Sequence, residues 1–215
     1  MDNRTLIAKR VAQEFKDGDI VNLGIGIPTL AANHLPEGIN ITLQSENGFV
    51  GLGPVEEVDP DLTNAGGQPA GILPGGATFD SALSFVIIRG GHVDATVLGA
   101  LEVDQEGNLA NWMVPGKIVP GMGGAMDLVV GAKRVIVAME HAGKGGSKKI
   151  LKKCTLPLTA VNVVDLIVTN LCVFEVTSKG LVLTELAPGV TVETVRENTD
   201  ADFTVSPNCQ EMKIS

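Results

Sequence analysis

The chain contains 215 residues, of which 44% are hydrophobic and 3% aromatic, and its formal net charge is -9. This length and apolar content predict one globular domain over residues 1–215. The acidic balance argues against nucleic-acid binding, and three scattered cysteines predict neither a disulfide framework nor a zinc site. No apolar run approaches the roughly 18 residues of a membrane span and no signal-peptide pattern opens the chain, so we expect a cytoplasmic protein without membrane contact.

The N-terminal part of the chain is predicted to form a helix, a strand and a second helix. Apolar residues recur at helical spacing through residues 4–16, and residues 20–23 are a short apolar strand. Residues 24–28 (GIGIP) lead into a predicted short helix at 29–35. A glycine-rich loop at this place can direct backbone N–H groups toward an anion or a polar ligand. A tight strand-to-helix turn is the alternative, because the dinucleotide-binding fingerprint is incomplete.

Glu46 lies where a carboxylate can meet a ligand. Residues 41–43 are a short apolar strand rich in β-branched residues, and Asn47 and Gly48 are a strong turn signal. Glu46 is therefore predicted to be the last residue of the strand or the first of the turn. The carboxyl ends of strands bind ligands in open α/β sheets. A solvated turn glutamate is the alternative.

The next part of the chain changes in composition. Residues 48–76 are rich in glycine, proline and acidic residues, which predicts a long irregular loop at an active site or an interface. Regular structure returns with a helix at 79–89, whose apolar face is predicted to carry Leu83, Val86 and Ile87.

A second glycine-rich stretch occupies residues 115–128. It follows predicted strands at 95–99 and 101–103, and a helix is predicted to begin within 125–130. Three of the four residues 121–124 are glycines, which leaves the backbone bare at the start of this helix. Bare N–H groups at a helix start are the ordinary material of an oxyanion hole, and a tight turn is the alternative.

The C-terminal half is predicted to consist mainly of strands. Residues 135–139 give the clearest signal for a central parallel strand, covered on both faces. Further strands are predicted at 166–169, 172–176, 181–186 and 202–206, with a helix at 192–198. The whole pattern predicts a three-layer α/β/α fold whose sheet is largely parallel, with antiparallel C-terminal strands.

Seven of the sixteen basic residues fall within a short span: Lys133, Arg134, Lys144, Lys148, Lys149, Lys152 and Lys153. This basic cluster either faces an anionic ligand such as a nucleotide phosphate or forms a solvated surface. The three histidines lie far apart and have no metal-binding spacing, so no metal site is expected.

Several stretches, in order along the chain, resemble one enzyme family. They are residues 24–28 (GIGIP), 45–48 (SENG), 64–66 (NAG), 88–94 (IRGGHVD), 108–112 (NLANW), 115–117 (PGK), 121–128 (GMGGAMDL) and 153–159 (KCTLPLT). Together they are similar to the β subunit of 3-oxoacid CoA-transferases, and most similar to the bacterial acetate or butyrate:acetoacetate type, in which the two halves of the enzyme are separate chains. The SENG and GMGGAMDL motifs are the most specific.

This resemblance implies a CoA-transferase/ribose-phosphate isomerase-like fold and a role in short-chain fatty acid and ketone-body metabolism. It implies ping-pong catalysis, in which Glu46 attacks an acyl-CoA such as acetoacetyl-CoA and forms a glutamyl-CoA thioester that a short-chain carboxylic acid then consumes. The Gly124 N–H is implied as an oxyanion donor. Candidate CoA- or substrate-binding positions are Gly24, Gly26, Asn47 and Gly123. No cofactor is implied beyond CoA as substrate, and the expected partner is the α subunit, in an αβ or α2β2 assembly.

Two other functions are compatible with the same residues. An acyl-CoA hydrolase would use Glu46 in the same way but transfer the acyl group to water. A non-enzymatic binding module is the second alternative, because the fold family also includes sugar-phosphate isomerases and ligand-sensing regulators.

Overall fold

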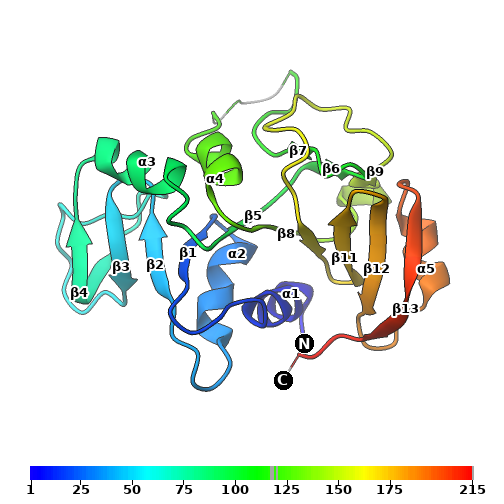
Figure 1. Cartoon of the computed structure of the whole chain (residues 1–215), viewed down its shortest axis with the longest axis horizontal. Coiled ribbons are helices and arrows are strands. Elements are labelled where there is room, and N and C mark those ends of the chain that lie inside the picture. The colour runs from blue at the N-terminus through cyan, green and yellow to red at the C-terminus, as the bar shows by residue number, and fades with distance from the viewer. Residues whose placement is uncertain (117–118, 120, 215) are drawn as a thin grey trace.

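The structure is a computed structural model that describes residues 1–116, 119 and 121–214 (Figure 1). A ten-stranded sheet forms its centre. From one edge to the other its strands are β13 (Phe203–Glu211), β12 (Gly180–Leu186), β11 (Cys172–Thr177), β10 (Leu166–Val168), β8 (Val135–Ala138), β5 (Ala95–Leu98), β1 (Ile20–Leu23), β2 (Thr42–Ser45), β3 (Phe49–Gly53) and β4 (Gly71–Thr78).

The middle of this sheet is parallel. Strands β2, β1, β5, β8 and β10 are consecutive neighbours and all run in the same direction. Every residue of β5 and β8 is buried, which explains why both sequences are almost purely apolar. The prediction of a central parallel strand at 135–139 is confirmed. The carboxyl ends of these five strands meet at one edge of the sheet, where ligand sites form in such folds.

Both flanks of the sheet are antiparallel. On one side β11 pairs antiparallel with β10 and with β12, and β13 adds parallel to β12. This confirms the predicted fold class, a largely parallel sheet with antiparallel C-terminal strands. The other side, β2-β3-β4, is also antiparallel.

The prediction of one irregular loop over residues 48–76 was wrong at both ends, where β3 and β4 form. Within these strands, glycines permit close strand pairing. A Cβ atom on Gly51 would lie 2.7 Å from the Cα atom of Gly76, so the two strands can approach only because this position has no side chain. Residues 54–70, between the strands, form the loop that remains.

Layers cover both faces of the sheet (Figure 1). One face carries α1 (Asn3–Ala12), α2 (Ile27–Leu30) and the short 3-10 helix η1 (Ala31–His34). The other face carries α3 (Ser81–Arg89), α4 (Ala125–Gly131), α5 (Val192–Asn198) and a small sheet of β7 (Leu109–Ala110), β6 (Glu102–Asp104) and β9 (Ile150–Leu151). The second outer layer is thus part helix and part sheet.

The core is divided between these faces. On β8, Ile136 and Ala138 pack with α1, through Ile7 and Val11, while Val137 packs with the layer that contains α4. This alternation follows from the two-residue period of a strand. No helix in the described part of the chain has the length and apolar character needed to cross a membrane.

Helix α3 is rotated from its predicted orientation. Its buried residues are Ser84 and Ile88, while Leu83 and Val86 are 47% and 64% exposed, so the predicted apolar face was wrong. A buried hydrogen bond, rather than apolar packing, sets the orientation of this helix. The Ser84 hydroxyl accepts a hydrogen bond from Gln44 Nε2 at 3.1 Å and therefore faces the end of β2.

Candidate active site

Glu46 is the first residue after β2, as predicted. The chain turns immediately afterwards and returns as β3. Gly48 makes this turn possible, with φ at 120°, and a Cβ atom there would lie 2.0 Å from the Phe79 carbonyl oxygen. Only glycine satisfies both conditions. The turn fixes Glu46, half-buried, at the carboxyl end of a central parallel strand.

One buried amide contacts the Glu46 carboxylate, and a second buried amide holds the first in place. Asn22 Nδ2, on β1, donates to Glu46 Oε2 at 3.1 Å and to Gln44 Oε1 at 2.8 Å. Gln44 in turn donates to Ser84 on α3. Asn22 and Gln44 are 2% and 3% exposed, so packing locks their side chains. Neither was predicted from the sequence, although polar residues within otherwise apolar strands, directly beside the predicted site, were a usable signal.

The second glycine-rich stretch lies against Glu46. Gly124 is the N-cap of α4, and a Cβ atom on it would lie 2.9 Å from Glu46 Cγ and 3.2 Å from Glu46 Cβ. No described residue accepts a hydrogen bond from the Gly124 N–H. Gly123, with φ at 53°, turns the chain into the helix. The structure therefore brings Gly124 and Glu46 together; positions 117, 118 and 120 of the predicted stretch lie outside the described residues.

Two further predicted positions, Gly24 and Gly26, lie in the loop after β1, the strand next to β2. The Gly24 N–H donates to the Val97 carbonyl oxygen at 2.8 Å, and a Cβ atom there would lie 3.1 Å from that oxygen, so Gly24 permits close packing of the loop on β5. Gly26 has φ at 101° and opens α2. Both features agree with a tight turn, and the turn places residues 24–28 beside the site.

Asn47 organises the neighbouring loop. Its side-chain amide donates to the Thr63 carbonyl oxygen at 2.6 Å, and the Ala65 N–H donates to Ser45 Oγ at 3.1 Å. These two bonds hold the 54–70 loop next to Glu46. The loop also approaches residues 24–28, since a Cβ atom on Gly66 would lie 3.2 Å from the Ile25 side chain.

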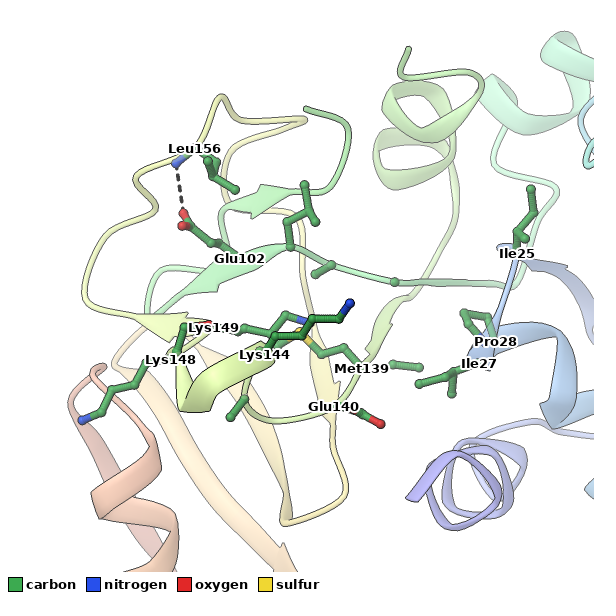
Figure 2. Close-up of a pocket in the computed structure, with 17 residues that line it drawn as sticks. Ile25, Ile27, Pro28, Glu102, Met139, Glu140, Lys144, Lys148, Lys149 and Leu156 are labelled. Carbon is green, nitrogen blue, oxygen red and sulfur yellow. Dashed lines mark hydrogen bonds between the residues drawn. The ribbon is translucent and has the colours of Figure 1, made fainter. Parts of the chain in front are cut away.

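A pocket of about 680 Å³ lies along the same edge of the sheet, at the ends of β1, β5 and β8 (Figure 2). We call it the lysine pocket. Its walls come from residues 25–28, 99–102 and 138–149 together with Leu156, and include Ile25, Pro28, Met139, Lys144 and Lys149. The 24–28 loop separates this pocket from the end of β2, because β1 lies between β2 and β5 in the sheet.

The structure divides six of the seven residues of the basic cluster into two groups, and the seventh, Lys153, is exposed outside both. Lys133 pairs with Asp94, Arg134 with Glu14 and Lys152 with Asp202. Lys144, Lys148 and Lys149 line the lysine pocket instead. Lys148 Nζ donates to the Thr199 carbonyl oxygen at 3.2 Å and points away from the cavity (Figure 2). Part of the cluster is therefore paired on the surface, and part faces a cavity.

His141 is buried behind the lysine pocket. Its Nδ1 and Nε2 atoms each lie 2.9 Å from a threonine hydroxyl, on Thr169 and Thr199 respectively. Burial, assisted by the nearby charge of Lys149, lowers the pKa of His141 to about 4. The ring therefore stays neutral and links the segment after β8 to Thr169 and to Thr199, at the end of α5. Across residues 1–116, 119 and 121–214, no three His, Cys, Asp or Glu side chains are grouped to hold a metal ion.

Comparison with known proteins adds an independent line of argument. The family model described as Coenzyme A transferase matches residues 4–198. Over 206 residues the chain is 65% identical to the beta chain of the acetate CoA-transferase of Escherichia coli K12, covering 96% of this chain and 95% of that protein. It is 54% identical to one subunit of a probable succinyl-CoA:3-ketoacid coenzyme A transferase of Bacillus subtilis, covering 94% of this chain and 95% of that one.

Solved structures of CoA-transferases have a similar fold. An acyl-CoA transferase from Escherichia coli O157:H7 superposes with a TM-score of 0.79 at 26% identity, over 99% of this chain. The present chain spans 43% of that longer polypeptide. Glutaconate coenzyme A-transferase from Acidaminococcus fermentans, at 18% identity and a TM-score of 0.73, has the same fold and is covered over 90% of its length.

Proposed function

Because the chain belongs to the coenzyme A transferase family, we propose that it is the catalytic β subunit of a 3-oxoacid CoA-transferase in which Glu46 carries the CoA group between two acids. The donor is an acyl-CoA such as acetoacetyl-CoA, and the acceptor is a short-chain acid such as acetate, butyrate or succinate. The observation that carries the proposal is the contact of Glu46 with Gly124 and Asn22 at the carboxyl ends of parallel strands.

The proposed reaction begins with attack by a Glu46 carboxylate oxygen on the thioester carbonyl carbon. The carbon–sulfur bond breaks, CoA leaves as a thiolate, and a mixed anhydride of Glu46 and the acyl group remains. The thiolate then attacks the glutamyl carbonyl carbon, which releases the acyl group as its carboxylate and leaves a glutamyl-CoA thioester. An incoming acid reverses both steps, which is ping-pong covalent catalysis.

Each attack produces a tetrahedral carbon bearing an oxyanion. In the proposed mechanism the Gly124 N–H donates to this oxygen, and one such donor is typically worth about 3 kcal/mol of barrier. Asn22 orients the attacking carboxylate through its bond to Oε2. The 54–70 loop, held beside Glu46 by Asn47 and Ser45, is placed to exclude water that would hydrolyse the intermediates.

Two comparisons support the chemistry and the partner. An acyl-CoA transferase 26% identical to this chain has been solved as a thioester complex with CoA. The Escherichia coli K12 relative is named as the beta member of its enzyme, which implies that an alpha member accompanies it. We therefore propose that the active enzyme is an αβ or α2β2 assembly and that this chain is inactive alone.

The test is the intact mass of the chain, co-purified with its α subunit, after incubation with acetoacetyl-CoA and no acceptor acid. A CoA adduct that maps to Glu46 and disappears when acetate is added is the expected result. Glu46→Gln should give no adduct, whereas Glu37→Gln, which changes an exposed glutamate elsewhere, should behave as wild type. An assembly that binds acyl-CoA without forming an adduct would overturn the proposal, and faster transfer to water than to acetate would identify a hydrolase.

A further inference from the structure

The lysine pocket is too far from Glu46 to hold the small acid but lies at the right distance for another part of the substrate. Glu46 follows β2, and the segment bearing Lys144 and Lys149 follows β8, three positions along the sheet. At the usual strand spacing this separation is about 14 Å. The far end of a four-carbon acid lies only about 5 Å from its reacting carbon, whereas the pantetheine arm of CoA spans roughly 15 Å from sulfur to the first phosphate.

The charges in the pocket suit an anion. The Lys144 and Lys149 side chains extend into the cavity, toward the loop that carries Ile25 and Pro28 (Figure 2). Neither ammonium forms a salt bridge with a described residue. Lys149 is half-buried, and burial lowers its pKa, with Glu140 opposing that effect. A bound anion would compensate for the lost hydration of this ammonium.

The acidic residues of the pocket leave the two lysines available. The Glu102 carboxylate accepts bonds from the Thr155 N–H at 2.7 Å and the Leu156 N–H at 3.0 Å, so it faces the 155–156 loop (Figure 2). Glu140 is exposed at the rim. Apolar residues such as Met139 and Pro28 form the rest of the wall and can pack against an uncharged arm.

We propose that Lys144 and Lys149 bind a phosphate group of CoA in the lysine pocket, with the pantetheine arm passing over the 24–28 loop to Glu46. The proposal rests on the proposed function of the chain as a CoA-transferase. It assigns the two lysines to substrate binding at a distance from the reacting atoms, so the quantity that tests them is the affinity for CoA. Lys148, from the same segment, is directed elsewhere and takes no part.

The test measures binding of CoA, dephospho-CoA and pantetheine to the assembly with its α subunit, using calorimetry. Lys144→Ala and Lys149→Ala should each weaken CoA binding about tenfold, as expected for loss of one charge-assisted contact. Neither should change pantetheine binding, since pantetheine has no phosphate. Dephospho-CoA, which lacks the 3′-phosphate, shows which phosphate the lysines bind. If the variants still weaken dephospho-CoA binding about tenfold, the lysines bind the pyrophosphate; if they do not weaken it, the lysines bind the 3′-phosphate. Lys153→Ala removes the same charge from an exposed position outside the pocket and serves as the matched control.

The outcomes are distinct. Wild-type CoA affinity in both lysine variants overturns this inference and leaves the proposed function intact. An increased KM for acetate, with unchanged CoA binding, also overturns it, because the pocket would then hold the acid. If the wild-type assembly binds no CoA at all, the proposed function itself fails.

Discussion

The contact between Gly124 and Glu46 allows a sharp prediction for Gly124→Ala. The new methyl carbon would lie 2.9 Å from Glu46 Cγ, whereas carbon atoms in contact prefer 3.5 to 4.0 Å. Glu46 Cβ is also only 3.2 Å away, so rotation of the distal carboxylate alone cannot relieve the clash. The Glu46 side chain must therefore move by roughly 0.6 Å or more.

A shift of that size disturbs the hydrogen bond between Asn22 and Glu46, which at 3.1 Å is already near the long end of the usual range of about 2.7 to 3.2 Å. The displaced carboxylate is then poorly oriented for attack, and because a misplacement of about 1 Å can cost about 100-fold in rate, kcat should fall roughly 10- to 100-fold. The backbone at position 124 has φ at -82° and accepts alanine without strain, and replacing a glycine N-cap costs about 1 kcal/mol of stability at most.

The assay compares kcat for transfer from acetoacetyl-CoA to acetate with the melting temperature of the same preparation. Val130→Ala is the matched control, because it alters the same helix at a residue that is 75% exposed. A Gly124→Ala enzyme with kcat within twofold of wild type would refute the conclusion that this contact positions the carboxylate. A large drop in melting temperature would assign the effect to folding instead.

Two further predictions concern stability rather than catalysis. The pKa of His141 is about 4 in the fold against 6.5 when free, so the free energy of unfolding is fully retained above about pH 6.5 and falls as the pH decreases toward 4. The loss should be about 2 kcal/mol between pH 7.5 and pH 5 in urea unfolding, and it should shrink in His141→Gln; an equal slope in both proteins would contradict the assignment. Arg10 is buried and pairs with Glu185 and Glu14, so Arg10→Met should lower the free energy of unfolding by about 3 to 5 kcal/mol while kcat of the folded enzyme is unchanged. Thermal unfolding measures this loss of stability. Arg4→Met, which changes an exposed arginine on the same helix, is the control and should unfold like wild type.

Local sequence predicted those features that depend on local physics. The strand at 135–139 was predictable because a strand covered on both faces must be apolar throughout, and the position of Glu46 followed from a strand beside an Asn-Gly turn. The pairing of β3 with β4 was not predictable in this way, because glycine signals either a loop or close backbone packing. Only the partner strand decides between them.

The orientation of α3 was missed for a related reason. Hydrophobic periodicity predicts the buried face of a helix only when burial is the dominant constraint, and here Ser84 is buried to reach Gln44. The residues that hold Glu46 form one connected set of polar contacts, from Ser84 through Gln44 to Asn22. Contacts between separate elements cannot be predicted from any one short segment of the sequence.

The kind of support that Glu46 receives suits the proposed chemistry. Asn22 gives it one neutral hydrogen bond, and no described lysine or arginine forms a salt bridge with it. Attack on a thioester consumes the negative charge of the carboxylate, so a cation paired with Glu46 would stabilise the ground state more than the transition state and raise the barrier. The neutral Asn22 amide orients the attacking Glu46 oxygen while stabilising the ground-state charge less than a cation would. The same reasoning favours a glycine N–H as donor to the oxyanion, since its benefit arises only when charge moves from Glu46 to the substrate oxygen.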